Sequence, residues 1–187
     1  MPGPDKLTAA LMARDWGQAE KLLRRAASSK KADGAVLYNL GKVLLEQDRP
    51  GAALVQLRKA VARRPGHADS WYELGRTALM ENDFPLALHA FTRACALAPE
   101  DMDARRSLGR VALRSGNYEA AKTAWSPLAG DAEADEALYR IAAETGDERA
   151  EDLRQALLAR PAGREAALKT MMRVSKGRVP LRVPGRS

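Results

Sequence analysis

Residues 68–101 read ADSWYELGRTALMENDFPLALHAFTRACALAPED, and the same pattern returns along the chain. The same residue types recur every 34 positions, as in the alanines Ala19, Ala53, Ala87 and Ala121. A leucine followed by a glycine keeps the same period, at Leu40-Gly41, Leu74-Gly75 and Leu108-Gly109. A period in this range indicates stacked supersecondary units rather than one globular core.

The stretch itself divides into two helical stripes. The first stripe holds Trp71, Leu74 and Gly75, and the second holds Ala87, Phe91 and Ala94. Polar residues 81–83 separate the stripes, and Pro99 ends the second helix because proline cannot continue one. We therefore predict two short helices joined by a tight turn, with Gly75 letting the second helix approach the first closely.

This pattern resembles the tetratricopeptide repeat. Within 68–101 the resemblance is carried by Trp71, Leu74, Gly75, Ala87, Phe91, Ala94 and Pro99. Residues 34–67 and 102–131 keep most of these positions. The second of these units departs at Arg105, and we expect its Pro127 to cut the second helix short. The resemblance implies an all-α fold, a right-handed α-solenoid of antiparallel helix pairs.

Both ends of the array are expected to be atypical, because their outer faces meet water instead of a neighbouring repeat. Residues 5–33 have Lys6-Leu7 where the family has Leu-Gly, which predicts a first repeat with a degraded first helix. Residues 132–161 predict a fourth, divergent repeat, and residues 164–173 predict a capping helix that completes a solenoid over 5–173. Residues 174–187 are basic and contain two prolines, and we expect a flexible tail there.

The formal net charge is +7, and most of it lies near the C-terminus. Residues 162–187 hold seven basic residues and one acidic residue, which leaves +1 for the rest of the chain. Nucleic-acid-binding proteins concentrate positive charge on the folded body. We therefore expect no specific nucleic-acid partner. Such a tail can contact phosphates or acidic lipid headgroups nonspecifically, but more often it is a solvated end or a linker.

No apolar stretch reaches the ~18 residues of a membrane span, and the N-terminus lacks the pattern of a signal peptide. We therefore expect no transmembrane segment and a cytoplasmic location.

No set of residues has the spacing of a catalytic or metal site. The two histidines, His67 and His89, and the single cysteine, Cys95, fall in no metal-binding pattern. Neither a glycine-rich phosphate loop nor a nucleophile elbow is present. We therefore expect a protein that is not an enzyme and that holds no cofactor and no metal ion. One cysteine also excludes an internal disulfide.

In the tetratricopeptide family the first helix of each repeat lines a concave groove, so the resemblance implies a binding face there. The 3.6-residue period places positions 5, 9 and 12 of each repeat on this face. The candidate groove residues are Tyr38, Lys42, Leu45, Tyr72, Arg76, Leu79, Arg106, Arg110, Leu113 and Arg140. A basic ladder beside a leucine ladder suits a protein or peptide partner with acidic and apolar side chains, because arginine can donate two parallel hydrogen bonds to a carboxylate.

A second interpretation of the groove needs no ligand. Arg76 can pair with Asp69 or Glu73 of its own helix. Arg110 can pair with Asp103 or with groups across the stack. Exposed pairs of this kind contribute only about 0–1 kcal/mol, and they would neutralise the ladder internally.

One known subtype of groove is not expected. Some tetratricopeptide co-chaperones bind a terminal carboxylate with a lysine, two asparagines, a second lysine and an arginine. The corresponding positions here hold Tyr38, Lys42, Glu73, Asp103 and Arg106, of which only the arginine agrees.

The leading function predicted from the sequence is a noncatalytic adaptor that binds a peptide or protein segment in the groove. One alternative is a noncatalytic arm of a larger bacterial enzyme, such as a sulfotransferase or a glycosyltransferase. Another is a scaffold that assembles with copies of itself.

Overall fold

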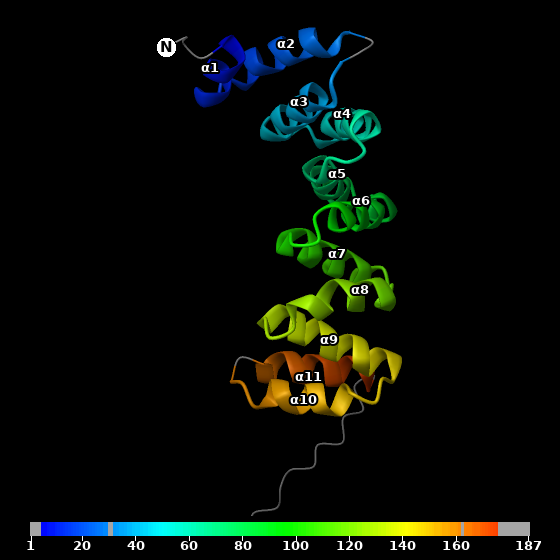
Figure 1. Cartoon of the computed structure of the whole chain (residues 1–187). Coiled ribbons are helices and arrows are strands. Elements are labelled where there is room, and N and C mark those ends of the chain that lie inside the picture. Colours follow the sequence, from blue (N-terminus) through cyan, green and yellow to red (C-terminus); the bar gives the residue numbers. More distant parts are fainter. Residues whose placement is uncertain (1–4, 30–31, 162, 176–187) are drawn as a thin grey trace, which may run out of the picture. The chain divides into compact units, whose positions relative to one another are not determined.

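The computed structural model describes residues 5–29, 32–161 and 163–175. Those residues form eleven α-helices, one short 3-10 helix and no strand, so the expected all-α class is confirmed (Figure 1). The helices are α1 (Lys6–Met12), α2 (Trp16–Ala27), α3 (Gly34–Glu46), α4 (Pro50–Arg63), α5 (Ala68–Met80), α6 (Phe84–Leu97), α7 (Met102–Arg114), α8 (Tyr118–Trp125), η1 (Ser126–Leu128), α9 (Ala132–Thr145), α10 (Ala150–Leu158) and α11 (Gly163–Val174).

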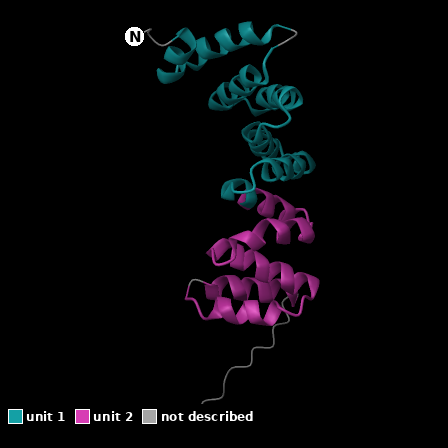
Figure 2. Ribbon diagram, viewed as in Figure 1, with its two compact units in different colours: residues 1–105 teal, residues 106–187 magenta. Residues whose placement is uncertain are grey.

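The chain forms two compact units, residues 1–105 (unit 1) and residues 106–187 (unit 2) (Figure 2). In unit 1 each helix packs against the next along the chain, and the first helix α3 also contacts the first helix α5. One continuous apolar core runs between these helices. It contains Ala10, Ala19, Leu23, Leu40, Val43, Leu44, Ala53, Leu57, Val61, Leu74 and Ala90.

The helix pairs α3/α4 and α5/α6 each close on a glycine of the first helix. A Cβ placed on Gly41 would lie 2.7 Å from Cγ of Leu57, and one placed on Gly75 would lie 2.8 Å from Cε1 of Phe91. Leu57 and Phe91 are fully buried. Any side chain larger than hydrogen would push the second helix away, which is the reason for the glycine that recurs in the sequence pattern.

Gly109 of α7 faces Trp125 of α8 in the same way in the next pair, where a Cβ would overlap the indole ring.

The turn inside each helix pair uses one backbone conformation. The residues 34 apart at this point, Arg14, Asp48, Asn82 and Gly116, have positive φ values of 54°, 55°, 60° and 71°. This left-handed conformation reverses the chain in few residues, although it is unfavourable for most side chains.

In three of these four turns the residue that follows the left-handed position caps the second helix. The side chains of Asp15, Asp83 and Asn117 accept hydrogen bonds from the backbone N–H three residues later, at 2.9, 3.1 and 3.1 Å. These bonds satisfy donors that a helix start would otherwise leave open.

In unit 2, α8 has eight residues and is followed by the 3-10 turn that contains Pro127, as the sequence predicts. The helices α10 and α11 both pack on α9 around a small core of Tyr139, Leu157 and Ala167. The helix α11 lies where the capping helix 164–173 is expected. The division of the chain into four repeats and a cap stays a prediction, and the tail lies outside the described residues from position 176 onward.

None of the helices in the described ranges combines the length and the apolar character that crossing a bilayer requires. The same ranges hold no group of three or more His, Cys, Asp or Glu side chains placed to bind a metal ion.

Candidate functional site

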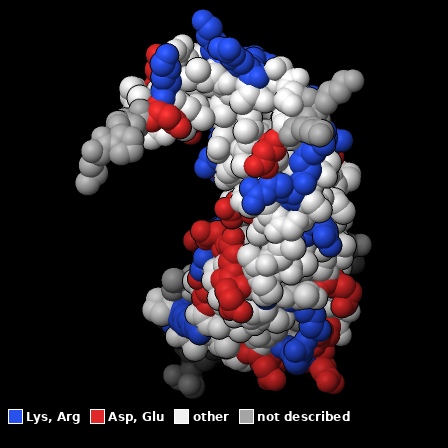
Figure 3. Space-filling model, turned by 45° about the horizontal axis from the view of Figure 1, so that its top comes forward, with Lys and Arg blue, Asp and Glu red and all other residues white. Residues whose placement is uncertain are grey.

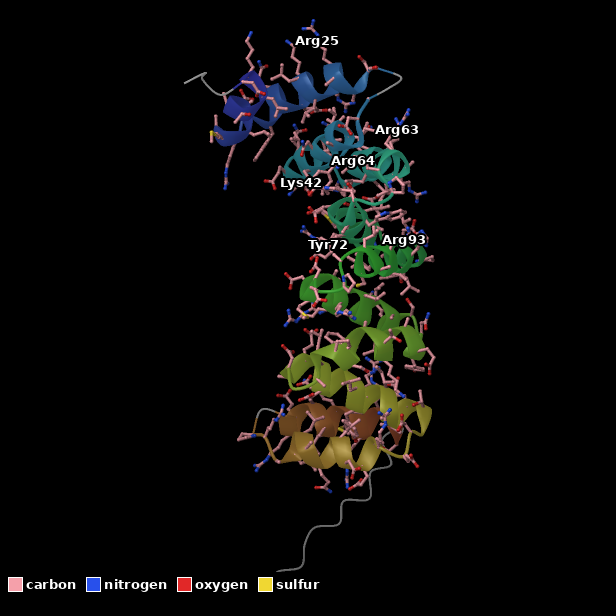
Figure 4. The ribbon with its side chains drawn as sticks, viewed as in Figure 1. Arg25, Lys42, Arg63, Arg64, Tyr72 and Arg93 are labelled. Carbon is pink, nitrogen blue, oxygen red and sulfur yellow. The ribbon has the colours of Figure 1, made fainter. Side chains whose placement is uncertain are left out.

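Two tyrosine–cation pairs recur on the first helices of unit 1. On α3, Nζ of Lys42 lies 5.7 Å from the ring centroid of Tyr38, and on α5, Cζ of Arg76 lies 6.0 Å from the ring centroid of Tyr72. The members of each pair are four residues apart, so they share one helix face. Figure 4 labels Lys42 and Tyr72 on this side of unit 1. We call this surface, formed by α3 and α5, the first-helix face.

Glu73 joins the two pairs. Its carboxylate oxygens both lie 3.2 Å from Nη1 of Arg76, and one lies 4.0 Å from Nζ of Lys42. The Glu73 side chain is only 9% exposed, whereas Lys42 and Arg76 are 49% and 53% exposed. Two accessible cations therefore share one buried carboxylate, and the cluster keeps an excess of one positive charge.

The tyrosines of this face are held in place by aromatic contacts. The Tyr38 ring meets the His67 ring edge-on at a centroid distance of 5.4 Å, and Tyr72 meets Phe91 of the core at 5.7 Å. Burial raises the pKa of the Tyr38 phenol. Fixed rings of this kind present contact area to a ligand with little loss of side-chain freedom.

A cavity of about 350 Å³ adjoins the Tyr38–Lys42 pair. It is lined by Leu11, Trp16, Tyr38, Asn39, Lys42, Val43 and Glu46, and we call it the Trp16 cavity. The sequence analysis did not assign five of these residues to the site: Leu11, Trp16, Asn39, Val43 and Glu46. The only signal in the sequence was that Trp16 lies in register with Pro50, Phe84 and Tyr118 at a spacing of 34 residues, because α1 departs from the family pattern.

The leucine ladder, which consists of Leu45, Leu79 and Leu113, lies partly against the core and partly on the surface. Leu45 and Leu79 are half-buried, and Leu45 packs against the core of unit 1. Leu113, in unit 2, lines a cavity. The ladder therefore helps to cover the core as well as shaping the surface.

Every candidate cation of unit 2 has a carboxylate partner. The pairs are Arg106 with Asp131 at 3.2 Å, Arg110 with Glu133 at 2.6 Å and Arg140 with Glu144 at 2.9 Å. The Arg110 pair is two-pronged, since Nε and Nη2 each donate to one oxygen of Glu133. The hydrogen bond from Arg106 helps to lower the pKa of Asp131 below its usual value. In unit 2 the basic ladder is thus paired internally.

Arg110, Leu113 and Arg140 also line one cavity of about 210 Å³, together with Lys169 and Thr170 of α11. The structure therefore brings three predicted groove residues together in unit 2, but two of them are arginines that already bind carboxylates.

A second basic surface lies on the second helices of unit 1. Figure 4 shows Arg63 and Arg93 on the side of the unit opposite Lys42 and Tyr72. The sequence analysis stressed the C-terminal charge and did not single out this surface. The available signal was the composition of residues 34–67, which hold six basic and two acidic residues. Acidic and basic side chains nevertheless lie beside each other in several places on the face drawn in Figure 3.

A family model for the tetratricopeptide repeat matches residues 5–68, 38–101 and 72–125. The chain belongs to the tetratricopeptide repeat family. The matched ranges overlap and contain the whole first-helix face of unit 1. A comparison with curated proteins gives no match.

Solved structures of other tetratricopeptide proteins share the fold. MamA is 21% identical, with a TM-score of 0.67 over 94% of this chain and 99% of MamA. YrrB, described as a TPR protein with an unusual peptide-binding site, is 21% identical, with a TM-score of 0.59 over 71% of this chain and 69% of YrrB. PilF of Pseudomonas aeruginosa is 18% identical, with a TM-score of 0.61 over 89% of this chain and 78% of its own. At these identities the likeness concerns the fold alone.

Proposed function

We propose that this tetratricopeptide protein is a noncatalytic cytoplasmic scaffold that binds a peptide or protein segment on the first-helix face of unit 1. The observation that carries the proposal is the shared carboxylate. Lys42 and Arg76 are both about half exposed and share the carboxylate of Glu73. A ligand carboxylate can accept hydrogen bonds from these cations while Glu73 stays in place.

The chemistry of the partner follows from the neighbouring surface. The Trp16 cavity offers the apolar walls of Leu11, Trp16 and Val43 next to Lys42. A segment with an aspartate or glutamate close to an aliphatic or aromatic residue would use both features at once. The peptide-binding site described for YrrB gives a precedent on the same fold. The cavity of about 210 Å³ that Arg110 lines in unit 2 is a weaker candidate for the binding site, because a ligand carboxylate there must first displace Glu133 from Arg110.

The test is a selection of binding peptides from a random display library, followed by fluorescence polarisation with the selected peptides. We expect enrichment of peptides that combine an acidic residue with an apolar one. The variant Lys42→Ala/Arg76→Ala should bind them about tenfold or more weakly, because a charge-assisted hydrogen bond contributes about 1.5–3 kcal/mol.

The matched control is Arg25→Ala/Lys59→Ala, which removes the same charge from the second helices α2 and α4. It should leave the affinity within about twofold at ~150 mM salt, where charges more than about 8 Å apart are screened. Equal losses in the two variants would show attraction by net charge alone and would reject a site on the first-helix face.

A further inference from the structure

Two short second helices flank α9 in unit 2. The helix α8 has eight residues and α10 has nine, whereas the second helices α4 and α6 of unit 1 each have 14. At Pro127 the chain turns in the 3-10 helix instead of continuing α8. The helix α9 has 14 residues, so its neighbours are too short to cover all of the side on which they pack.

An open cavity of about 520 Å³ lies on this side of α9. Its walls are largely apolar and include Leu138 and Ile141 of α9 and Leu153 and Ala156 of α10. We call it the Leu153 cavity. Sites that hold ligands have volumes of roughly 300–1,000 Å³ and mostly apolar walls, so this cavity has the size and character of a binding site.

The mouth of the Leu153 cavity carries accessible charges of both signs. Asp147 is bound by Nη2 of Arg149 at 2.7 Å and by Nζ of Lys122 at 3.2 Å, and the Arg149 side chain remains exposed. Asp152, which is exposed at the same mouth, has no hydrogen bond or ion pair within the described ranges. An apolar segment that carries a basic and an acidic residue would complement both the walls and the mouth.

The helix α11 exposes an apolar stripe. Leu168 is 51% exposed and Met172 is 59% exposed, and their spacing of four residues places them on one side of the helix. The opposite side holds the buried Ala167 and Thr170, and α11 packs there against α9 and α10. Adjacent apolar side chains that face water are typical of a contact site for another surface.

The charges beside this stripe are those that the mouth of the cavity requires. Glu165 and Lys169 form an ion pair at 2.6 Å, and both side chains are about three-quarters exposed. An ion pair this exposed holds its members only weakly, so both side chains can turn to other partners.

The stripe and the Leu153 cavity of one molecule face different surroundings. Ala167, on the inner side of α11, belongs to the core with Tyr139 and Leu157. None of the described residues of α11 lines the Leu153 cavity. Leu168 and Met172 point away from that core, so they cannot enter the cavity of their own chain while α11 stays packed on α9. The stripe can fill only the cavity of another molecule.

We propose that α11 of one molecule binds in the Leu153 cavity of a second copy of this chain. Leu168 and Met172 cover the apolar walls, and α11 lies where the missing turns of α8 would otherwise pack. Lys169 pairs with Asp152, and Glu165 pairs with Arg149.

The two surfaces of this contact differ, so the contact is heterologous. It either closes when two molecules exchange α11 reciprocally or continues as an open chain of copies. The first-helix face takes no part, so the contact is independent of the peptide binding proposed above. One side of a short helix buries little area, and we expect a dissociation constant of about 10–100 µM.

Sedimentation velocity of the full chain, at concentrations from about 5 to about 500 µM, tests the contact because this range brackets the expected dissociation constant. The wild type should associate as its concentration rises. Leu168→Glu/Met172→Glu removes the stripe and Ala156→Glu places a charge in the cavity, so each variant alone should stay monomeric. Each variant keeps the surface that the other lacks, and a mixture of the two should form a 1:1 complex. A monomeric wild type at the highest concentration, or a mixture without a complex, would overturn the proposal.

The matched control is Val55→Glu/Met80→Glu, which changes two apolar side chains of unit 1 that are 49% and 50% exposed. It adds the same charge as Leu168→Glu/Met172→Glu and should associate like the wild type. All the substituted positions are exposed, and circular dichroism confirms that each variant keeps its helices. An equal loss of association in the control would reject α11 as the contact.

A charge exchange tests the assigned pairing without touching the apolar walls. Asp152→Lys should weaken association about fivefold or more, because Lys169 then meets a like charge. Lys169→Glu in the same chain should restore most of the loss. A double variant that associates no better than Asp152→Lys would contradict the pairing of Lys169 with Asp152.

Discussion

Nε of Arg105 donates a hydrogen bond to the carbonyl oxygen of Pro99, 2.8 Å away. Thirty-four residues earlier, the indole Nε1 of Trp71 donates to the carbonyl oxygen of Pro65, also at 2.8 Å. Both bonds satisfy the carbonyl of the proline that follows a second helix. The repeat pattern has a tryptophan at this position. Arg105 replaces it and still donates the equivalent hydrogen bond to the proline carbonyl.

We expect Arg105→Ala to lower the free energy of unfolding by about 1 kcal/mol, because the Pro99 carbonyl loses its donor. Arg105→Trp restores an N–H donor at the same position and should recover most of that loss, whereas Arg105→Leu should not. Urea unfolding monitored by circular dichroism gives the three values. If Arg105→Trp were as unstable as Arg105→Leu, the two bonds would not be equivalent.

The contact between Gly75 and Phe91 predicts a large effect from one methyl group. A Cβ at position 75 would lie 2.8–2.9 Å from three ring atoms of the fully buried Phe91. We expect Gly75→Ala to destabilise the protein by about 1–3 kcal/mol through overpacking. The double variant Gly75→Ala/Phe91→Leu should lose less than the sum of the single variants.

The control for this experiment is Gly66→Ala, because nothing lies within 4 Å of a Cβ placed there. It should change the stability by less than about 0.5 kcal/mol. Equal losses in Gly66→Ala and Gly75→Ala would mean that the close approach of the helices is not the cause.

Arg14 has a φ of 54° at the turn position where another repeat has Gly116. A left-handed conformation is unfavourable by about 1–2 kcal/mol for a side chain with a Cβ. We therefore expect Arg14→Gly to raise the melting temperature, and Gly116→Ala to lower it, each by an amount that corresponds to roughly 1 kcal/mol. A lower melting temperature for Arg14→Gly would show that the Arg14 side chain makes a compensating contact.

Glu73→Gln should strengthen the binding of acidic peptides to the first-helix face. The change keeps the size of the side chain and removes the one negative charge between Lys42 and Arg76. We expect the affinity to increase about threefold or more, and we expect this increase to be larger at low salt than at high salt. Polarisation measurements at two salt concentrations test it, and an affinity that falls would imply that Glu73 is needed to position the cations.

Acid should weaken the ion pairs that Glu20 forms with Arg24 and Arg49. The hydrogen bond from Nε of Arg24 is the main cause of a lowered Glu20 pKa, and Arg49 also contributes. Because the pKa of Glu20 is lower in the folded state than its ordinary value of 4.5, this contribution to stability is complete above that pH and is lost as the pH falls through the lowered pKa. The stability difference between wild type and Glu20→Gln should therefore shrink between about pH 5 and about pH 2 in urea unfolding experiments. A stability difference that stays constant over this pH range would contradict the prediction.

The period of the sequence was enough to predict the helix pairs, because Leu40-Gly41 and Leu74-Gly75 mark packing that depends on local spacing alone. It also placed Lys42 and Arg76 on one face. Their shared partner was harder to predict, since Glu73 pairs both with Arg76 of its own helix and with Lys42 of the preceding repeat. That arrangement depends on how neighbouring repeats are rotated, which no spacing within one repeat determines.

Other features left little or no trace in the sequence. Of the four left-handed turn positions only Gly116 is a glycine, so the backbone at Arg14 and Asp48 could not be inferred. Pro127 correctly predicted a short α8. The cavity beside α8 could not be foreseen, because its existence depends on which side chains α9 and α10 turn toward the gap.

The glycine contacts have a consequence for how such a chain can change in length. Gly41 faces a leucine, Gly75 a phenylalanine and Gly109 a tryptophan, so the spacing inside each pair is adjusted to its own partner. If the second helices of two pairs were exchanged, each glycine would face a side chain of the wrong size, although the 34-residue register would stay intact. We therefore expect duplications and deletions to preserve the packing best when their end points fall in the loops between pairs, which makes the helix pair the smallest unit that can be copied without repacking.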